Sequence, residues 1–143
     1  MKKMILDASV VLKWYLSDEK LSSSALSLLD RHVFGELEIL APSLLEYEVI
    51  NGLMIAQKRG RIKETIILEA VEGFINLGIK YHSPALFYPT ALQFTQKYDI
   101  SFYDASYLGL AHKEKAFLIT ADSRLLKACQ KDFKWIRPLF MIA

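Results

Sequence analysis

Short apolar runs alternate along this chain with longer stretches in which apolar residues recur at helical spacing. The short runs predict strands over residues 3–6, 38–41, 79–82, 116–120 and 135–136. The longer stretches predict helices over residues 10–15, 20–33, 44–58, 63–77, 84–98, 103–115 and 123–130. Strands that alternate with helices are typical of an α/β fold, in which helices cover both faces of a mostly parallel sheet.

Residues with strong preferences at the ends of elements set some of these boundaries. Pro42 should end the second strand, and Ser43 stands where the N-cap of the following helix is expected. Asp7 or Ser9 is a candidate N-cap for the first helix. Pro42 and Ser43 therefore predict a sharp turn from strand to helix at the edge of the sheet.

Composition narrows the class of protein. With 143 residues, of which 52% are hydrophobic, the chain is expected to form one domain over residues 1–143 with its own core. The net charge of +2 is too small to indicate a nucleic-acid partner by itself. The single cysteine, Cys129, excludes an internal disulfide and indicates a reducing compartment. No apolar run reaches the length of a membrane span and no signal peptide is recognised, so we expect a cytoplasmic protein without a membrane partner.

Acidic residues follow the predicted strands at one edge of the sheet. Asp7 follows the first strand and Asp122 follows the fourth, and in an open parallel sheet ligands bind beyond the carboxyl ends of the strands. Asp104 begins a helix and is a third candidate. Glu46 and Glu48 point roughly 200° apart on a helix, so only one can face a given site. Glu48 is mildly preferred, because Asn51 and Gly52 lie on or beside its side of the helix.

A cluster of carboxylates without lysine or arginine partners indicates a divalent cation. Carboxylate oxygens suit Mg²⁺ or Mn²⁺, and such a site hydrolyses phosphodiesters without a histidine or serine nucleophile. Taken singly, each acid has a plainer interpretation: Asp7 and Asp122 as helix caps, Asp104 as a first-turn charge, and the glutamates as solvated helix residues. Only their joint occurrence favours the metal site.

Four segments resemble the PIN-domain ribonucleases, most closely the VapC-type toxins of prokaryotic toxin–antitoxin pairs. The segments are ILDASVV (5–11), APSLLEYEVINGL (41–53), SFYDASYL (101–108) and LITADSRL (118–125). Each segment alone is weak evidence, but their order and separations match the family along the whole chain.

The resemblance implies a three-layer α/β/α sandwich, a homodimer and a cognate antitoxin that inhibits the active site. It implies an acidic metal-site quartet of Asp7, Glu48, Asp104 and Asp122. The family's glutamate precedes a Val-x-Asn, which selects Glu48 over Glu46. The resemblance also implies Ser9 and Thr120 as polar supports of the quartet, and Asn51, on the same side of the helix as Glu48, is a further candidate. Some relatives carry a further acid shortly after the last aspartate, and residues 123–125 offer none, which bears on whether one metal or two is held.

The resulting hypothesis is a metal-dependent endoribonuclease, the toxin of a toxin–antitoxin pair. RNA needs positive charge at the rim of the site, and the candidates are Lys13, Arg124 and Lys127, each of which is equally well explained as surface charge. A PIN-like module that binds RNA or protein without cleaving it remains the main alternative. A phosphatase with Asp7 as nucleophile is weakened by Ser9, because such enzymes usually place a second aspartate there.

Overall fold

The computed structural model describes residues 2–142, which contain a five-stranded sheet in the order β3-β2-β1-β4-β5. The strands are β1 (Lys2–Leu6), β2 (Leu37–Pro42), β3 (Lys80–His82), β4 (Phe117–Thr120) and β5 (Ile136–Pro138). All four neighbouring pairs are parallel. The prediction of an alternating α/β fold around a parallel sheet is confirmed.

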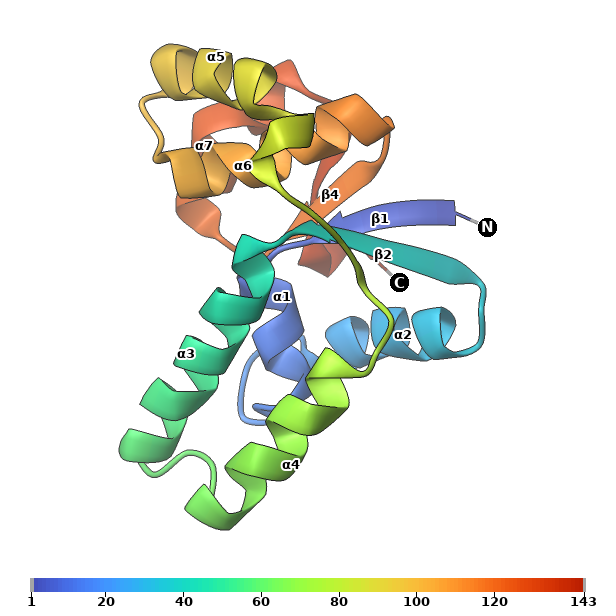
Figure 1. Ribbon diagram of the computed structural model, residues 1–143, viewed down its shortest axis with the longest axis vertical. Coiled ribbons are helices and arrows are strands. Elements are labelled where there is room, and N and C mark those ends of the chain that lie inside the picture. Colours follow the sequence, from blue (N-terminus) through green and yellow to red (C-terminus); the bar gives the residue numbers. More distant parts are fainter. Residues whose placement is uncertain (1, 143) are drawn as a thin grey trace.

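Helices cover both faces of the sheet. The α-helices are α1 (Ala8–Val11), α2 (Ser22–Val33), α3 (Leu44–Lys58), α4 (Glu64–Ile75), α5 (Tyr88–Tyr98), α6 (Phe102–Glu114) and α7 (Ser123–Cys129). Short 3₁₀ segments are η1 (Leu12–Trp14), η2 (Pro84–Leu86), η3 (Gln130–Asp132) and η4 (Leu139–Met141). Helices α1 to α4 lie on one side of the sheet and α5 to α7 on the other (Figure 1). These three layers match the expected α/β/α sandwich.

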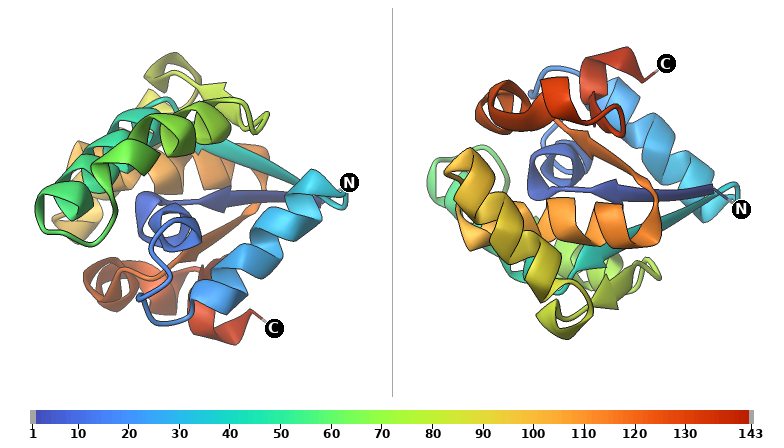
Figure 2. Two further views of the ribbon diagram at one scale, coloured as in Figure 1. Left: turned by 90° about the horizontal axis from the view of Figure 1, so that it is seen from below. Right: turned by 90° about the horizontal axis from the view of Figure 1, so that it is seen from above.

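The core centres on β1 and α6. Met4, Ile5 and Leu6 are almost completely buried between β2 and β4. Every residue of α6 from 105 to 111 is buried, because this helix packs on three strands and carries α5 on its outer side (Figure 2). Gly109 permits this close packing, since a Cβ there would lie 3.1 Å from the Cβ of Ala91. The central position of α6 places its N-terminus, with Asp104, at the carboxyl edge of the sheet.

The structure differs from the predicted elements mainly at helix beginnings. The helix expected over residues 10–15 is a single α-helical turn, α1, that continues as η1. The helix expected from residue 84 begins at Tyr88, because η2 occupies the preceding segment. Ser43 stands at the N-cap position of α3, as expected, but its side chain makes no capping hydrogen bond. Within residues 2–142, no helix is both long and apolar enough to cross a membrane.

Candidate functional site

The four predicted acids all lie at the carboxyl edge of the sheet. Asp7 joins β1 to α1, and Asp122 joins β4 to α7. Glu48 comes from the first half of α3, and Asp104 from the first turn of α6. Because β1 and β4 are neighbouring parallel strands, their ends bring Asp7 and Asp122 together from positions far apart in the sequence.

Asp7 is a buried carboxylate, 6% exposed, that is held by two hydroxyl groups. Ser9 Oγ donates to its Oδ1 at 2.5 Å, and Thr120 Oγ1 donates to its Oδ2. Burial raises the pKa of Asp7 to about 6, against the lowering effect of these hydrogen bonds, and the nearby Asp122 raises it further. The protein therefore holds at this position a charge that burial disfavours.

The same two hydroxyls join Asp7 to the loop that carries Asp122. The backbone N–H of Ala121 donates to Ser9 Oγ at 2.9 Å, and that of Asp122 donates to Thr120 Oγ1 at 3.0 Å. The supporting roles expected for Ser9 and Thr120 therefore have a structural counterpart. Both residues orient Asp7 and the β4–α7 loop relative to each other.

Glu48 and Glu46 point in different directions, as helical geometry requires. Glu48 accepts a hydrogen bond from the Tyr107 hydroxyl, while burial, followed by the charge of Asp104, raises its pKa. Glu46 instead acts on the pKa of Tyr81, elsewhere in the fold. Asn51 is exposed and makes no side-chain hydrogen bond to any residue that the structure describes. Of the two glutamates, Glu48 is the one that faces the other acids.

Asp104 and Asp122 complete the group. Burial raises the pKa of Asp104, Asp122 raises it further, and Arg124 partly offsets this effect. Asp122 also caps α7, because its Oδ1 accepts from the backbone N–H groups of Arg124 at 2.9 Å and Leu125 at 3.4 Å. The plainer interpretation of Asp122 as a helix cap is therefore correct, and the same carboxylate acts on both neighbouring acids.

The donor set fits a hard divalent cation. The charge of Asp122 raises the pKa of both Asp7 and Asp104, and the charge of Asp104 raises the pKa of Glu48. Within residues 2–142, no lysine, arginine or histidine nitrogen lies within 4.0 Å of the carboxylates of Asp7, Glu48 or Asp104. As these side chains lie, no three acids, histidines or cysteines of the described chain are close enough to hold one ion. Mg²⁺ binds through one or two carboxylates and keeps several waters, so it does not require a closer cluster.

Basic residues flank the acids on two sides. Lys13, predicted as a rim cation, is almost buried, and its Nζ lies 3.5 Å from Glu19. It lines a cavity of about 320 Å³ that begins at Ser9 and Ala121 and extends to Arg59 and Arg61.

The other two predicted RNA contacts lie on α7. Arg124 and Lys127 are exposed, and the Nε of Arg124 lies 3.9 Å from Asp122. Arg124 and Asp104 both line a second cavity of about 460 Å³. Cationic side chains therefore stand on both flanks of the carboxylates.

Tyr107 makes a contact with Glu48 that the sequence alone does not specify. Its ring is almost buried, as core packing predicts, yet its hydroxyl reaches Glu48. The neighbouring carboxylates add to the effect of burial in raising its pKa. The signal was present in the spacing, because Tyr107 follows Asp104 by three residues and shares its side of α6.

Comparisons with known proteins agree with this fold. The PIN domain family model matches residues 4–131. Ribonuclease VapC3 of Pyrobaculum aerophilum is 30% identical over 126 residues, which cover 86% of this chain and 92% of that protein. The crystal structure of PAE2754 from the same organism has a TM-score of 0.68 at 22% identity, covering 97% of this chain and 85% of that one.

Two further solved structures share the fold. VapC20 of Mycobacterium tuberculosis, described as a sarcin-ricin loop cleaving toxin, has a TM-score of 0.64 at 13% identity, over 94% of this chain and 99% of that one. A toxin–antitoxin complex from Klebsiella pneumoniae contains a chain with a TM-score of 0.55 at 15% identity, over 88% of this chain and 92% of that one.

Proposed function

The chain belongs to the PIN domain family, and on that premise we propose that it is a metal-dependent endoribonuclease, the toxin of a toxin–antitoxin pair. The proposed metal-binding and catalytic residues are Asp7, Glu48, Asp104 and Asp122. The proposed ion is Mg²⁺ or Mn²⁺. Ribonuclease activity is proposed by analogy with the ribonuclease VapC3, to which the chain is 30% identical.

The observation that carries the proposal is the environment of Asp7. A buried carboxylate without a cationic partner is unfavourable unless a bound cation compensates it. Three further acids from separate elements lie beside it, and these carboxylates raise one another's pKa values. A purely structural role would need only one buried acid. A cluster of this kind is costly for the fold alone and useful for binding a cation.

The chain's residues have separable roles in this mechanism. A bound divalent cation would lower the pKa of the attacking water and stabilise the charge that develops on the phosphate. Ser9 and Thr120 fix the orientation of Asp7, and Tyr107 fixes that of Glu48. Asp122 uses Oδ1 to cap α7, which leaves its Oδ2 outside those hydrogen bonds and available as a ligand.

The flanking cations are proposed to bind the RNA backbone. The cavity at Lys13 offers Arg59 as an exposed cation, and Arg124 offers another beside Asp104. Lys13 itself is proposed to stabilise the wall of this cavity through its ion pair with Glu19. It is also proposed to contact a phosphate at the end of the cavity nearest Ser9. Lys127 lies further along α7 and is proposed as a peripheral contact.

We also propose a homodimer and a cognate antitoxin as partners. Several apolar side chains on α3 and α4 are exposed, including Tyr47 at 76% and Leu68 at 70%, which is typical of surfaces that a partner covers. The fold is shared with a chain of a toxin–antitoxin complex.

The test is cleavage of total cellular RNA by the purified, antitoxin-free chain. We expect cleavage with Mn²⁺ or Mg²⁺, none in EDTA, and none by Asp104→Asn. The matched control is Asp30→Asn, which removes one exposed acid from α2 and should cleave like the unmodified protein. Metal-independent cleavage, or full activity of Asp104→Asn, would contradict the proposal. Well-folded protein that binds RNA without cutting tRNA, rRNA or mRNA would instead favour the non-catalytic binding module.

A further inference from the structure

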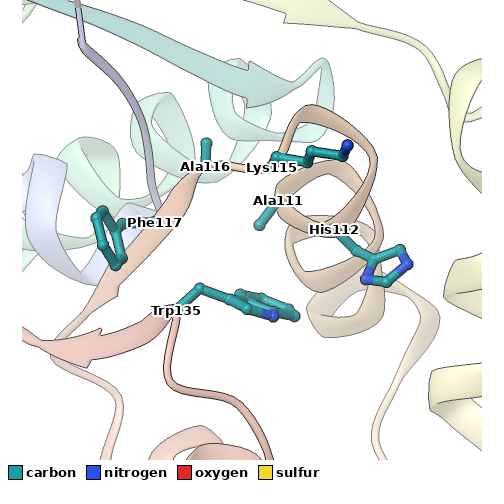
Figure 3. A pocket seen from close by; sticks show the side chains of 6 residues that line it. All are labelled: Ala111, His112, Lys115, Ala116, Phe117 and Trp135. Carbon is teal, nitrogen blue, oxygen red and sulfur yellow. The ribbon is translucent and has the colours of Figure 1, made fainter.

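A third cavity, with the features of a ligand site, lies at the opposite edge of the sheet from the four acids. It measures about 330 Å³ and is lined by the end of α6 and the beginnings of β4 and β5 (Figure 3). The lining residues are Ala111, His112, Lys115, Ala116, Phe117 and Trp135. We call it the Trp135 cleft. Asp104 and Lys115 are eleven residues apart along α6, which separates the cleft from the acids by about 16 Å at 1.5 Å per residue.

The shape of the Trp135 cleft suits a flat aromatic group. Ala111 and Ala116 are buried and have small side chains, so they leave space beside the indole. One side of the indole packs on Phe133, at 4.7 Å between ring centroids, and Phe133 does not line the cleft. His112 stands at the other end, 6.4 Å from the indole. The indole is thus held in place by its neighbours while part of it faces open space.

One lysine lines the Trp135 cleft, and other cations lie next to it in the sequence or on the far side of β4. Lys115 lies at its rim, and Lys134 precedes the tryptophan. The ring of Phe117 points to the other side of β4, where Lys2 and Arg137 lie over it at 5.0 Å and 4.3 Å from its centroid. Within the described chain, no carboxylate lies within 4.0 Å of the charged groups of these four cations.

The backbone of Lys115 is a second unusual feature of the rim. Its φ is +52°, in the left-handed region where glycine is the usual residue after a helix. The chain therefore accepts a disfavoured conformation at the one cation that lines the cleft.

We propose that the Trp135 cleft binds one unpaired base of single-stranded RNA, with Lys115 on the adjoining phosphate. Exposed aromatic rings among cations are the usual means of binding single strands, because every base can stack and every phosphate is negative. The ligand's identity as RNA rests on the proposed function. The cleft would then bind the substrate at a second point, distant from the bond that is cleaved.

The test measures binding in EDTA, so that it does not depend on cleavage. The chain has two tryptophans, and Trp14 is buried with its Nε1 bonded to the carbonyl of Ala25. In Trp14→Phe protein, the remaining fluorescence reports on Trp135 alone. Adenosine and cytidine monophosphates should quench this fluorescence. Quenching should disappear in Trp14→Phe protein that also carries Lys115→Gly, because that variant lacks the phosphate contact.

Affinity for a labelled single-stranded RNA dodecamer is the second readout. Trp135→Leu should weaken binding roughly tenfold, the effect of losing one stacked base. Lys115→Gly relieves the left-handed strain, so it should fold at least as well as the unmodified protein, and it should reduce the salt dependence of binding by about one phosphate contact. The matched control is Lys58→Ala, which removes an exposed cation from the far end of α3.

Unchanged RNA affinity in both Trp135→Leu and Lys115→Gly, or an equal loss in Lys58→Ala, would overturn the proposal. Quenching of Trp135 by a partner protein but not by nucleotides or RNA would also overturn it. Neither result bears on metal-dependent cleavage, which is tested separately with Asp104→Asn.

Discussion

Replacing Asp7 with asparagine should have opposite effects on stability without and with a divalent cation. Burial raises the pKa of Asp7 from 3.8 to about 6. Between pH 3.8 and about 6, the folded protein keeps a proton on Asp7 that the unfolded chain has released. The contribution of Asp7 to stability therefore falls as the pH rises and is lowest above about pH 6. At about 1.4 kcal/mol per pKa unit, the buried charge costs about 3 kcal/mol at neutral pH.

Asparagine has the same shape and carries no charge, so Asp7→Asn should remove most of that cost in EDTA. At neutral pH the variant should melt several degrees higher than the unmodified protein, since 1 kcal/mol corresponds to about 2–4 °C in larger domains. Near pH 4 the two proteins should converge. With a cation present at a hundredfold excess over its dissociation constant, the unmodified protein should gain about 2.7 kcal/mol and the variant much less.

The assay is thermal unfolding of both proteins, at pH 4 and pH 7.5 in EDTA and at pH 7.5 with Mn²⁺ or Mg²⁺. An Asp7→Asn protein that is less stable in EDTA at pH 7.5 would refute the argument that the carboxylate is uncompensated. An equal gain from metal in both proteins would refute Asp7 as a ligand. Asp30→Asn should follow the unmodified protein in every condition.

Two substitutions test how the acids are positioned. Tyr107→Phe removes the hydroxyl that donates to Glu48. It should lower the cleavage rate by about 10- to 100-fold, as losing the support of a metal ligand typically does, and lower the free energy of unfolding by only about 1 kcal/mol. Cleavage at the unmodified rate would exclude this role. Ser101→Ala removes the side chain that accepts from the N–H of Asp104 and should cost about 1 kcal/mol in urea unfolding, whereas Ser43→Ala, at a cap position without such a bond, should cost under about 0.5 kcal/mol. Equal costs would show that the cap bond contributes nothing.

The order of elements was predictable because the pattern of apolar residues reports burial directly. The pattern predicts a strand over residues 3–6 because Met4, Ile5 and Leu6 are consecutive apolar residues, and helices cover both faces of the sheet, so that all three side chains are buried. The helix expected over residues 10–15 was predicted less well, because the pattern does not register the change to 3₁₀ geometry at Leu12. Helix ends depend on local hydrogen bonds, and Ser43 shows that a favourable residue at a cap position need not form one.

The candidate site was predictable in its acids but not in its contacts. The carboxyl ends of parallel strands meet at one edge, so the positions of Asp7 and Asp122 follow from the sheet alone. Lys13 is almost buried and its Nζ lies 3.5 Å from Glu19, a pairing that no local sequence pattern indicates. The bond from Tyr107 to Glu48 joins residues 59 positions apart, and the two meet only because α3 and α6 both begin at the carboxyl edge of the sheet.

The central claim is that four particular carboxylates support metal-dependent RNA cleavage, and Glu48 tests it most directly. Glu48→Gln and Glu46→Gln make the same chemical change two residues apart on one helix, but only Glu48 faces the other acids. Cleavage of RNA with Mn²⁺ should be abolished by Glu48→Gln and unchanged by Glu46→Gln. Full activity of Glu48→Gln, or equal loss in both variants, would contradict the account.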